Sequence, residues 1–284
     1  MVATPIGNRD DITLRALKIL KGVDVVAAED TRHTGRFLKH HEIKSKLISY
    51  HEHNEKERTP ALIERLKAGA SIALVSNAGT PALSDPGYRL IKSAIESNIK
   101  VTPIPGVSAA ITALSVSGLP TNSFVFIGFP PKKKAKRLKL FDKLTTVSGT
   151  LIFYESPRRI LKLVEEIHSI MGDRPAVLSR EMTKLHEEFT RCSLSQMLDH
   201  LRQGHEIKGE CTLLVGADKG SPDASLASLM DELNQGLKKK DATVSRLSKE
   251  LARRHGIPKS VVYQKAVEIK RSDRSRSRTS ETDA

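Results

Sequence analysis

Residues 71–87 read SIALVSNAGTPALSDPG, and their pattern indicates the fold class most clearly. The apolar run at 71–76 has the length and composition of a buried strand, and the Gly, Pro and polar residues after it predict a loop. The amphipathic segment at 87–97 then predicts a helix. A short strand, a Gly/Pro-rich loop and a helix in this order are typical of an α/β domain with a parallel sheet.

The same order recurs on both sides of this stretch. Further strands are predicted at 1–4, 23–28, 46–50 and 100–104, and further helices at 11–21, 34–41, 55–67 and 107–117. Five strands, each followed by a helix, predict an N-terminal α/β domain over residues 1–118.

A second α/β domain is predicted over 119–220, after a Gly- and Pro-containing break at 118–123. Its predicted strands are 124–129, 150–155, 176–180, 187–192 and 210–215, and its predicted helices are 133–144, 158–171 and 194–203. Fewer helices than strands predict a mixed sheet. Apolar stripes then predict a small helix-turn-helix-like domain at 221–270, and the Ser/Arg-rich residues 271–284 predict a disordered tail.

The charge of the chain is local. It has 47 Lys and Arg against 33 Asp and Glu, a net charge of +14. Residues 131–143 carry +6 of this excess and residues 237–271 carry +8, so the remainder is neutral. This distribution argues against a uniformly basic, chromatin-like protein. It favours acidic partners such as nucleic acid, with a solvated surface as the alternative.

Several classes of protein are disfavoured. The two cysteines lack the spacing of a zinc site or a disulfide framework. The longest apolar piece without Pro, Gly or Asn, residues 107–117, is shorter than the ~20 residues that a membrane span needs. No basic and apolar leader opens the sequence, so we expect a cytoplasmic protein. Neither GxGxxG after the first strand nor a P-loop occurs, which disfavours dinucleotides and nucleoside triphosphates.

Ligands of parallel α/β sheets bind at the carboxyl ends of the strands, so the five loops there are the candidate site. Each is rich in Gly, Pro or polar residues. Such loops let backbone groups approach a ligand closely, which suits a zwitterionic molecule that carries a nucleoside. The alternative is that Gly and Pro only turn the chain.

Seven segments carry a family resemblance. They are VATPIGNRDDITLRAL (2–17), AAEDTRHTGRFL (27–38), SYHEHNE (49–55), SNAGTPALSDPGYRL (76–90), IPGVSAAITALSVSGLPT (104–121), FYESPRR (153–159) and REMTKLHEEF (180–189). Together, over about residues 1–219, the chain resembles the ribosomal RNA small subunit methyltransferase I family of the tetrapyrrole-methylase-like superfamily. AEDTRHT, YESPRR and TKLHEE point to the ribosomal RNA branch.

The resemblance implies transfer of a methyl group from S-adenosyl-L-methionine to the 2′-hydroxyl of a cytidine near the decoding centre of 16S ribosomal RNA. It also implies a homodimer that acts on small-subunit RNA or the 30S subunit. The cofactor-binding residues that it implies are Pro5, Gly7, Asn77, Gly79, Thr80, Ser108, Ala109, Ala110, Tyr154, Gly209 and Glu210. Asn77 departs from the family pattern, which usually has Asp, and this removes a charge beside the expected cofactor ammonium group.

Loss of the hydroxyl proton calls for a general base or a cationic neighbour. The candidates are Asp30, His53, Glu181 and Lys184, and the sequence does not choose among them. Asp30 could instead cap a helix, and Glu181 could belong to an ion pair between the domains. No metal is expected, although His51 and His53 resemble a ligand pair. The expected RNA-binding residues are Arg32, Lys132, Lys133, Lys134, Lys136 and Arg137.

Two other functions remain open at this stage. A tetrapyrrole methyltransferase of the uroporphyrinogen or precorrin type would share the fold but have no use for the basic segments. A ribosome-associated RNA-binding protein without enzyme activity would use those segments but not the TPIGN, AGTP and PGVSA loops.

Overall fold

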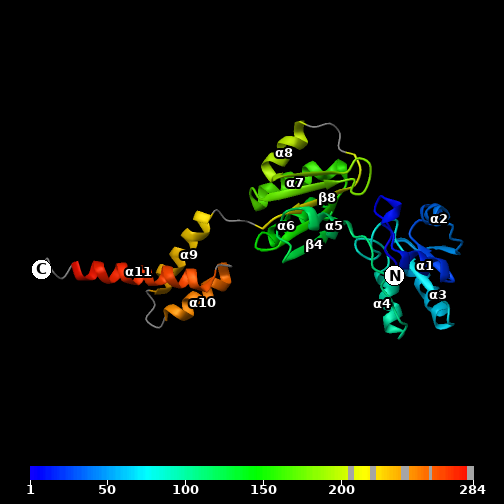
Figure 1. The fold of residues 1–284 in the computed structure, drawn as a ribbon, viewed down its shortest axis with the longest axis horizontal. Coiled ribbons are helices and arrows are strands. Elements are labelled where there is room, and N and C mark those ends of the chain that lie inside the picture. Colours follow the sequence, from blue (N-terminus) through cyan, green and yellow to red (C-terminus); the bar gives the residue numbers. More distant parts are fainter. Residues whose placement is uncertain (204–207, 218–221, 238–242, 256–257, 280–284) are drawn as a thin grey trace. The chain divides into compact units, whose positions relative to one another are not determined.

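The computed structural model describes residues 1–203, 208–217, 222–237, 243–255 and 258–279. The chain divides into two compact units, Met1–Asp218 and Lys219–Ala284. The first unit contains both sheets and the second is helical (Figure 1).

The first sheet is parallel and has the order β2-β1-β3, from β1 (Val25–Ala28), β2 (Leu47–Ser49) and β3 (Ile72–Val75). Two of the five predicted strands, 1–4 and 100–104, form isolated bridges instead of regular ladders. Val2 pairs in parallel with Ile104 and donates its N–H to Leu74. Pro103 and Pro105 have no N–H group to donate, which explains why pairing there stays short.

Helices cover both faces of this sheet. They are α1 (Leu14–Gly22), α2 (Thr31–His40), α3 (Glu55–Lys67) and α4 (Tyr88–Glu96), preceded by the 3₁₀ turn η1 (Arg9–Asp11). Side chains alternate along β1: Val26 and Ala28 pack against α1 and α2, whereas Ala27 faces the core under α3 and α4. This packing leaves the loops at the strand ends to form the site.

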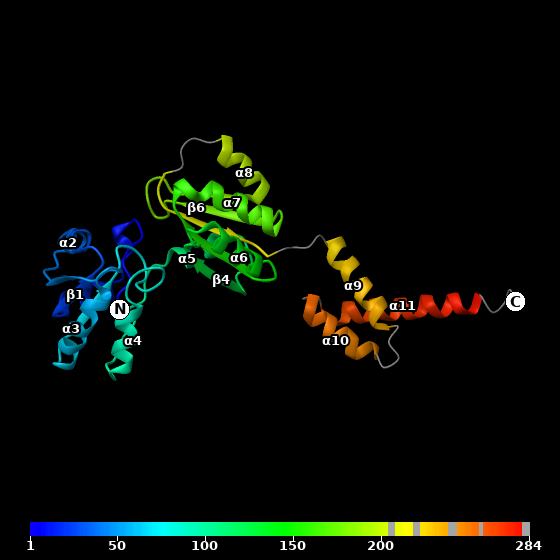
Figure 2. The ribbon, with the colours of Figure 1, turned by 180° about the vertical axis from the view of Figure 1, so that it is seen from behind.

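The second sheet is mixed, as predicted, with the order β4-β5-β8-β6-β7. Its strands are β4 (Phe124–Gly128), β5 (Thr150–Glu155), β6 (Pro175–Arg180), β7 (Glu188–Ser193) and β8 (Cys211–Val215). Strands β4 and β5 are parallel, and β8 lies antiparallel between β5 and β6. Helices α6 (Lys134–Leu144), α7 (Pro157–Met171) and α8 (Leu194–Gln203) cover one face (Figure 2).

Helix α5 (Ala109–Val116) covers the other face of the second sheet. Ala110, Ala113 and Leu114 pack with Ile152 and Leu214. The predicted boundary at residue 118 is therefore wrong for this helix, which follows the last strand of the first sheet but packs on the second. Its sequence is apolar almost all round, so periodicity alone did not show which sheet would bury it.

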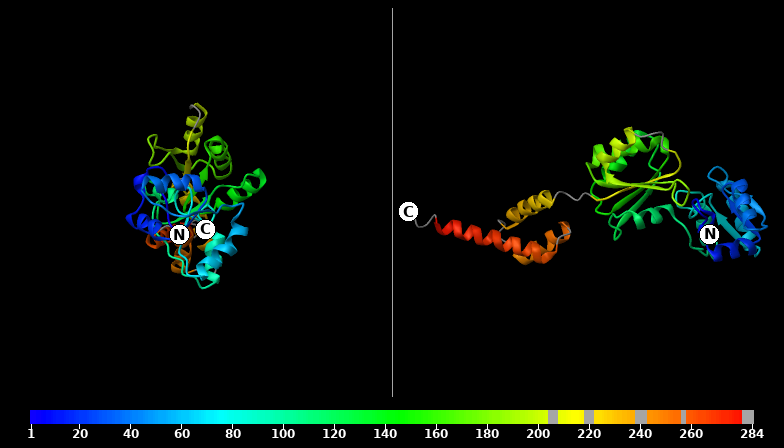
Figure 3. Two further views of the ribbon diagram at one scale, coloured as in Figure 1. Left: turned by 90° about the vertical axis from the view of Figure 1, so that its right-hand side faces the viewer. Right: turned by 45° about the horizontal axis from the view of Figure 1, so that its top comes forward.

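The C-terminal unit consists of α9 (Pro222–Leu237), α10 (Val244–His255) and α11 (Lys259–Thr279), which pack side by side (Figure 3). Leu229, Leu233, Leu251, Val262 and Ala266 form its core, close to the predicted stripes. The predicted turn at 256–257 lies outside the described residues. Helix α11 extends into the predicted tail as far as Thr279, over a stretch that contains neither Gly nor Pro, and residues 280–284 lie outside the described residues. Among the residues that the structure describes, none of the helices has the length and apolar character to span a bilayer.

Candidate active site

A largely apolar pocket of about 350 Å³ lies where loops of the first sheet meet the ends of β5 and β8. Among the residues that line it are Ile6, Ala78, Gly79, Thr80, Asp85, Ser108, Ala109, Phe129, Tyr154, Met182, Gly209 and Glu210. A concave, mostly apolar pocket of this size with a few polar groups is typical of a small-molecule site. We call it the apolar pocket.

Backbone hydrogen bonds fix the loops that form its floor. Thr4 and Gly79 exchange two bonds, each with an N···O distance of 2.9 Å, and the Thr80 hydroxyl donates to Val107 O at 3.0 Å. Gly79 has φ +74°, in the left-handed region where a side chain is disfavoured. The chain's own hydrogen bonds therefore hold the floor in place.

Tyr154 joins the second sheet to the first turn of α5. Its hydroxyl accepts the backbone N–H of Ala110 at 3.0 Å, and burial raises the pKa of this phenol. Its ring makes edge contacts with Phe126 and Phe129. Ala110 itself does not line the pocket; it orients the tyrosine that does.

Asp85 is a pocket residue that the sequence analysis missed. Burial, followed by the charges of Glu29 and Glu210, raises its pKa from 3.8 to about 6. A cation bound beside Asp85 would stabilise its ionised form and lower the pKa again. The Pro and Gly residues of the SDPG segment predicted a loop, but they gave no sign that its aspartate would lie in a pocket.

A second pocket of about 560 Å³, the polar pocket, adjoins the first and shares Ile6, Ala78 and Glu210 with it. The rest of its lining comes from the loop that begins at residue 4, η1, α2, the end of β3 and the loop after β6. These residues are Thr4, Pro5, Gly7, Arg9, Asp30, His33, Thr34, Arg36, Phe37, Ser76, Asn77 and Lys184. Charged side chains make up about twice the share of the lining here that they do in the apolar pocket, and three of them are basic: Arg9, Arg36 and Lys184.

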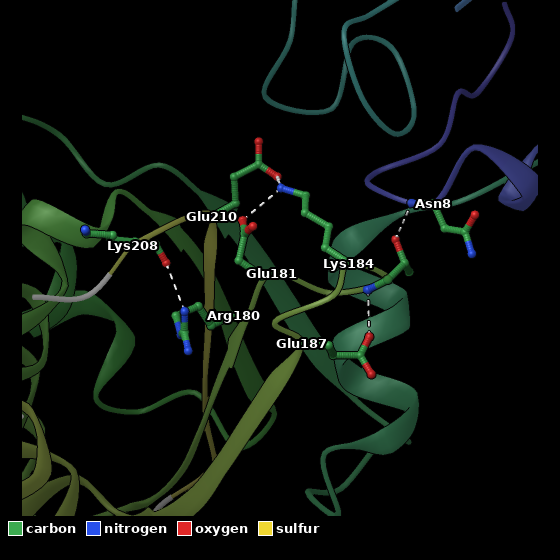
Figure 4. Close-up of polar contacts among 8 residues, drawn as sticks. Asn8, Arg180, Glu181, Lys184, Glu187, Lys208 and Glu210 are labelled. Atoms are coloured by element: carbon green, nitrogen blue, oxygen red, sulfur yellow. Dashed lines mark hydrogen bonds and ion pairs between the residues drawn. The ribbon is translucent and has the colours of Figure 1, made fainter. Parts of the chain in front are cut away.

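An ion-paired cluster forms part of the shared wall (Figure 4). Lys184 Nζ lies between two carboxylates, donating to Glu181 Oε1 at 2.8 Å and to Glu210 Oε2 at 3.2 Å. The hydrogen bond from Lys184 lowers the pKa of Glu181 against the effect of burial. Burial lowers the pKa of Lys184, but its bonds to the two carboxylates outweigh this and the net shift is upward. Both groups are thus held in their charged forms.

Two glycines let this cluster approach the rest of the wall. A Cβ on Gly7 would lie 2.6 Å from Lys184 Cγ, and one on Gly209, where φ is +90°, would overlap the Glu181 side chain. Glu181 and Thr183 themselves have positive φ, and Thr183 Oγ1 accepts the Asn8 N–H at 2.9 Å (Figure 4). The loop after β6 is therefore fastened to the loop after residue 4.

The predicted cofactor residues divide between the pockets. Gly79, Thr80, Ser108, Ala109, Tyr154 and Gly209 line the apolar pocket, Pro5, Gly7 and Asn77 line the polar one, and Glu210 lines both. The Asn77 N–H donates to Glu29 Oε2 at 3.1 Å. An amide at this position keeps a further carboxylate away from Glu29, whose charge already acts on Asp85.

The predicted catalytic residues are only partly brought together. Asp30 and Lys184 line the polar pocket, and Glu181 holds Lys184. The Asp30 carboxylate caps α2, and hydrogen bonds from the N–H groups of Arg32 and His33 lower its pKa. His53 lines neither pocket and lies in the turn after β2, with its ring 6.0 Å from that of His51.

The predicted RNA-binding lysines Lys132, Lys133, Lys134 and Lys136 are exposed, and they begin three residues after the pocket residue Phe129. Arg32 is exposed as well, at 89% of its side chain. The prediction is wrong for Arg137: its guanidinium is buried, pairs with both oxygens of Glu166 and donates to Pro131 O and Lys132 O at 3.0 Å. Arg137 supports the basic loop instead of presenting its own charge.

Comparison with known proteins agrees with this architecture. Residues 1–198 match the family model of the Tetrapyrrole (Corrin/Porphyrin) Methylases. The uroporphyrin-III-C-methyltransferase of Thermus thermophilus has the same fold, with a TM-score of 0.52 at 20% identity, over 76% of this chain and 92% of that one.

Curated relatives are much closer in sequence. The ribosomal RNA small subunit methyltransferase I of Micromonospora olivasterospora is 43% identical over 93% of this chain and 84% of its own length. The protein of that name from Halalkalibacterium halodurans is also 43% identical, over 93% of this chain and 92% of its own. Identity of this extent, together with the fold, shows that the chain belongs to the ribosomal RNA small subunit methyltransferase I family, within the tetrapyrrole methylases.

Proposed function

We propose that this protein transfers a methyl group from S-adenosylmethionine to the ribose 2′-hydroxyl of a cytidine in 16S ribosomal RNA. The observation that carries the proposal is the pair of adjoining pockets with opposite chemistry, one apolar and acidic and the other polar and basic. Membership of the family and the two basic segments support RNA as the acceptor. We place the reaction in the cytoplasm, on the 30S subunit or its RNA.

The residues of the apolar pocket fit the cofactor. Its apolar side chains suit an adenosine, and Asp85 supplies the carboxylate that an ammonium or sulfonium group would stabilise. Gly79 leaves backbone groups open to close approach because it has no side chain. The bound cofactor supplies an activated methyl group on a sulfonium, so the protein must mainly orient and deprotonate the acceptor.

For deprotonation we propose Asp30 as the proton acceptor. It lines the polar pocket, and all the contacts described for its carboxylate are made by Oδ1, which leaves Oδ2 directed to no described partner. Lys184 then stabilises the negative charge that forms on the hydroxyl oxygen, because Glu181 and Glu210 keep it protonated. Glu181 acts as a positioning residue, and we assign no catalytic role to His53.

The tetrapyrrole alternative shares the fold but leaves two observations unexplained. The exposed side chains of Lys132, Lys133, Lys134 and Lys136 begin three residues after the pocket residue Phe129 and are suited to bind RNA phosphates. The C-terminal unit exposes further cations on α10 and α11, at Arg246, Lys249, Lys259 and Lys270. The reading as a non-enzymatic RNA-binding protein leaves the preformed apolar pocket without a purpose.

We also propose a homodimer, formed through an apolar surface of the first unit. Strand β4 is at the edge of its sheet and exposes Phe124 and Val125, and α5 exposes Ile111 and Val116, between 36% and 50% each. Edge strands that expose apolar side chains are commonly covered by another chain, and a second copy offers the same edge. Analytical ultracentrifugation should show a dimer for the wild type and a monomer for Phe124→Lys; an unchanged dimer would place the interface elsewhere.

The function is tested by incubating the protein with methyl-labelled S-adenosylmethionine and either 30S subunits or uroporphyrinogen, and then mapping the label. We expect label on a cytidine ribose of 16S RNA and none on the tetrapyrrole. Label on a base would refute the acceptor atom, and label on the tetrapyrrole alone would refute the substrate class.

A further inference from the structure

We propose that the polar pocket is the acceptor-nucleotide site and that Arg9 and Arg36 hold a phosphodiester group of the target RNA there. Neither arginine was predicted from the sequence to have a role in binding. The inference rests on the proposed function, since it assumes that the acceptor is RNA, and it adds the residues that position this acceptor.

The charges that line the polar pocket do not cancel. Each of its two carboxylates has a cationic partner: Asp30 Oδ1 lies 3.6 Å from Arg32 Nε, and Glu210 Oε2 accepts from Lys184 at 3.2 Å. Lys184 stays protonated, and its charge is balanced by Glu181 and Glu210. Within the described part of the chain, neither Arg9 nor Arg36 forms an ion pair, and the polar contact described for Arg9 is a long one of 3.4 Å to His40 Nδ1.

The surplus charge therefore belongs to the side of the pocket formed by η1 and α2. Arg9 comes from η1, and His33 and Arg36 come from α2 one helical turn apart, so the three side chains lie along one wall. The planar guanidinium group presents several N–H donors whose spacing matches the oxygens of a phosphate. Two such groups that line one pocket are therefore suited to bind a phosphate there.

The polar pocket shares one wall, formed by Ile6, Ala78 and Glu210, with the apolar pocket. A nucleotide with its phosphate on Arg9 and Arg36 would have its sugar in the pocket that Asp30 and Lys184 also line. The volume of about 560 Å³ suits one nucleotide. Phosphate contacts of this kind fix the register of the RNA without reading its sequence.

The test uses the full-length variants Arg9→Ala and Arg36→Ala, with Arg65→Ala as the control. Arg65 is an exposed arginine of α3 that lines neither pocket, so this control removes the same charge elsewhere. Three quantities are measured: the affinity for 16S RNA at several salt concentrations, the affinity for S-adenosylhomocysteine by calorimetry, and the kcat and KM of methyl transfer.

We expect each pocket variant to bind RNA about five- to tenfold more weakly near 0.1 M salt and to lower the salt slope by about 0.7–0.9, the effect of one lost phosphate contact. KM for RNA should rise by a similar factor, while affinity for S-adenosylhomocysteine stays unchanged. Arg9→Lys and Arg36→Lys should recover the salt slope but only part of the affinity, because a lysine cannot form a bidentate contact.

Two results would overturn the inference. RNA binding and KM equal to those of Arg65→Ala would show that no phosphate sits on these arginines. A matching loss of affinity for S-adenosylhomocysteine would assign the polar pocket to the carboxylate end of the cofactor. Failure of the proposed function looks different, because the wild type would then leave 16S RNA unlabelled whatever the variants do.

Discussion

The two pockets share three wall residues but differ in how their charges are balanced. In the apolar pocket the half-buried carboxylate of Asp85 has a raised pKa and would be stabilised by a cation. In the polar pocket each carboxylate has a cationic partner, whereas Arg9 and Arg36 form no ion pair with any residue that the structure describes. The charge of each pocket is therefore complementary to a different ligand: a cationic cofactor in the apolar pocket and an anionic polymer in the polar pocket. Substitutions should therefore affect one ligand at a time, except in the shared wall.

The largest expected effect is that of Asp30→Asn on the polar side. Asparagine keeps an oxygen that can cap α2, so the melting temperature should change little, but it cannot accept the hydroxyl proton. We expect single-turnover methyl transfer to slow by about 10²–10⁴-fold, the usual contribution of a general base. Affinity for S-adenosylhomocysteine should not change. A rate within threefold of the wild type would remove Asp30 from the mechanism.

The next effect is that of Gly7→Ala, which should disturb both pockets because it acts on their common wall. The new methyl group would meet Lys184 Cγ and Thr183 Oγ1 at 2.6 Å and force the loop after β6 away. Overpacking of this kind typically costs about 1–3 kcal/mol of stability, measurable by urea unfolding.

A matched control for this change is Gly22→Ala, at the end of α1. A Cβ at Gly22 meets nothing within 4 Å, so its effect on stability and on both ligands should be slight. If the two alanine variants behaved alike, the close approach at Gly7 would have no importance for the wall.

A smaller effect is expected on the apolar side from Asp85→Asn, which should weaken binding of S-adenosylmethionine about tenfold at pH 8. In the wild type this affinity should rise with pH through about 6, since only the ionised carboxylate attracts a cation. At pH 5 the two proteins should bind nearly equally. Calorimetry at both pH values measures this, and a pH-independent difference would contradict the role of charge.

The same variant should be more stable than the wild type at pH 8. The folded pKa of Asp85, about 6, lies above its ordinary value of 3.8, so the folded state binds the proton more tightly and loses stability as pH rises between these values. Removing the carboxylate should restore about 1 kcal/mol at pH 8, after allowance for partial exposure, and nothing at pH 3. A melting temperature of Asp85→Asn below that of the wild type at pH 8 would show that the Asp85 carboxylate does not destabilise the folded state.

The smallest effect is predicted for Arg32→Ala. Arg32 lies on α2 with Arg36, but its side chain is 89% exposed and does not line the polar pocket. RNA affinity should fall by less than about twofold, the value for a screened surface charge. A loss as large as that of Arg36→Ala would mean that RNA follows the outer surface of α2 and not the pocket.

The regular elements could be predicted closely from the sequence because their patterns are local. The amphipathic pattern placed α3 at its observed bounds, and the apolar run placed β5 at its own. Packing partners could not be predicted in this way. The assignment of α5 to a sheet and the burial of Arg137 depend on contacts with Ile152 and with Glu166, which is 29 residues away.

The candidate site was predicted to a similar degree. Its loops were identified, because Gly and Pro mark them, but not the division of their residues between two pockets. Asp85 and Arg36 were missed since their importance comes from electrostatic surroundings, a raised pKa in one case and a missing partner in the other. Such surroundings are assembled by the fold and have no signature in a local motif.

Ultraviolet cross-linking to 16S RNA with S-adenosylhomocysteine bound tests whether RNA occupies the polar pocket while the cofactor occupies the apolar one. Peptide mapping should place cross-links in the segments that contain Arg9 and Arg36, which line the polar pocket. Cross-links centred instead on Tyr154 and Met182, inside the apolar pocket, would contradict the account.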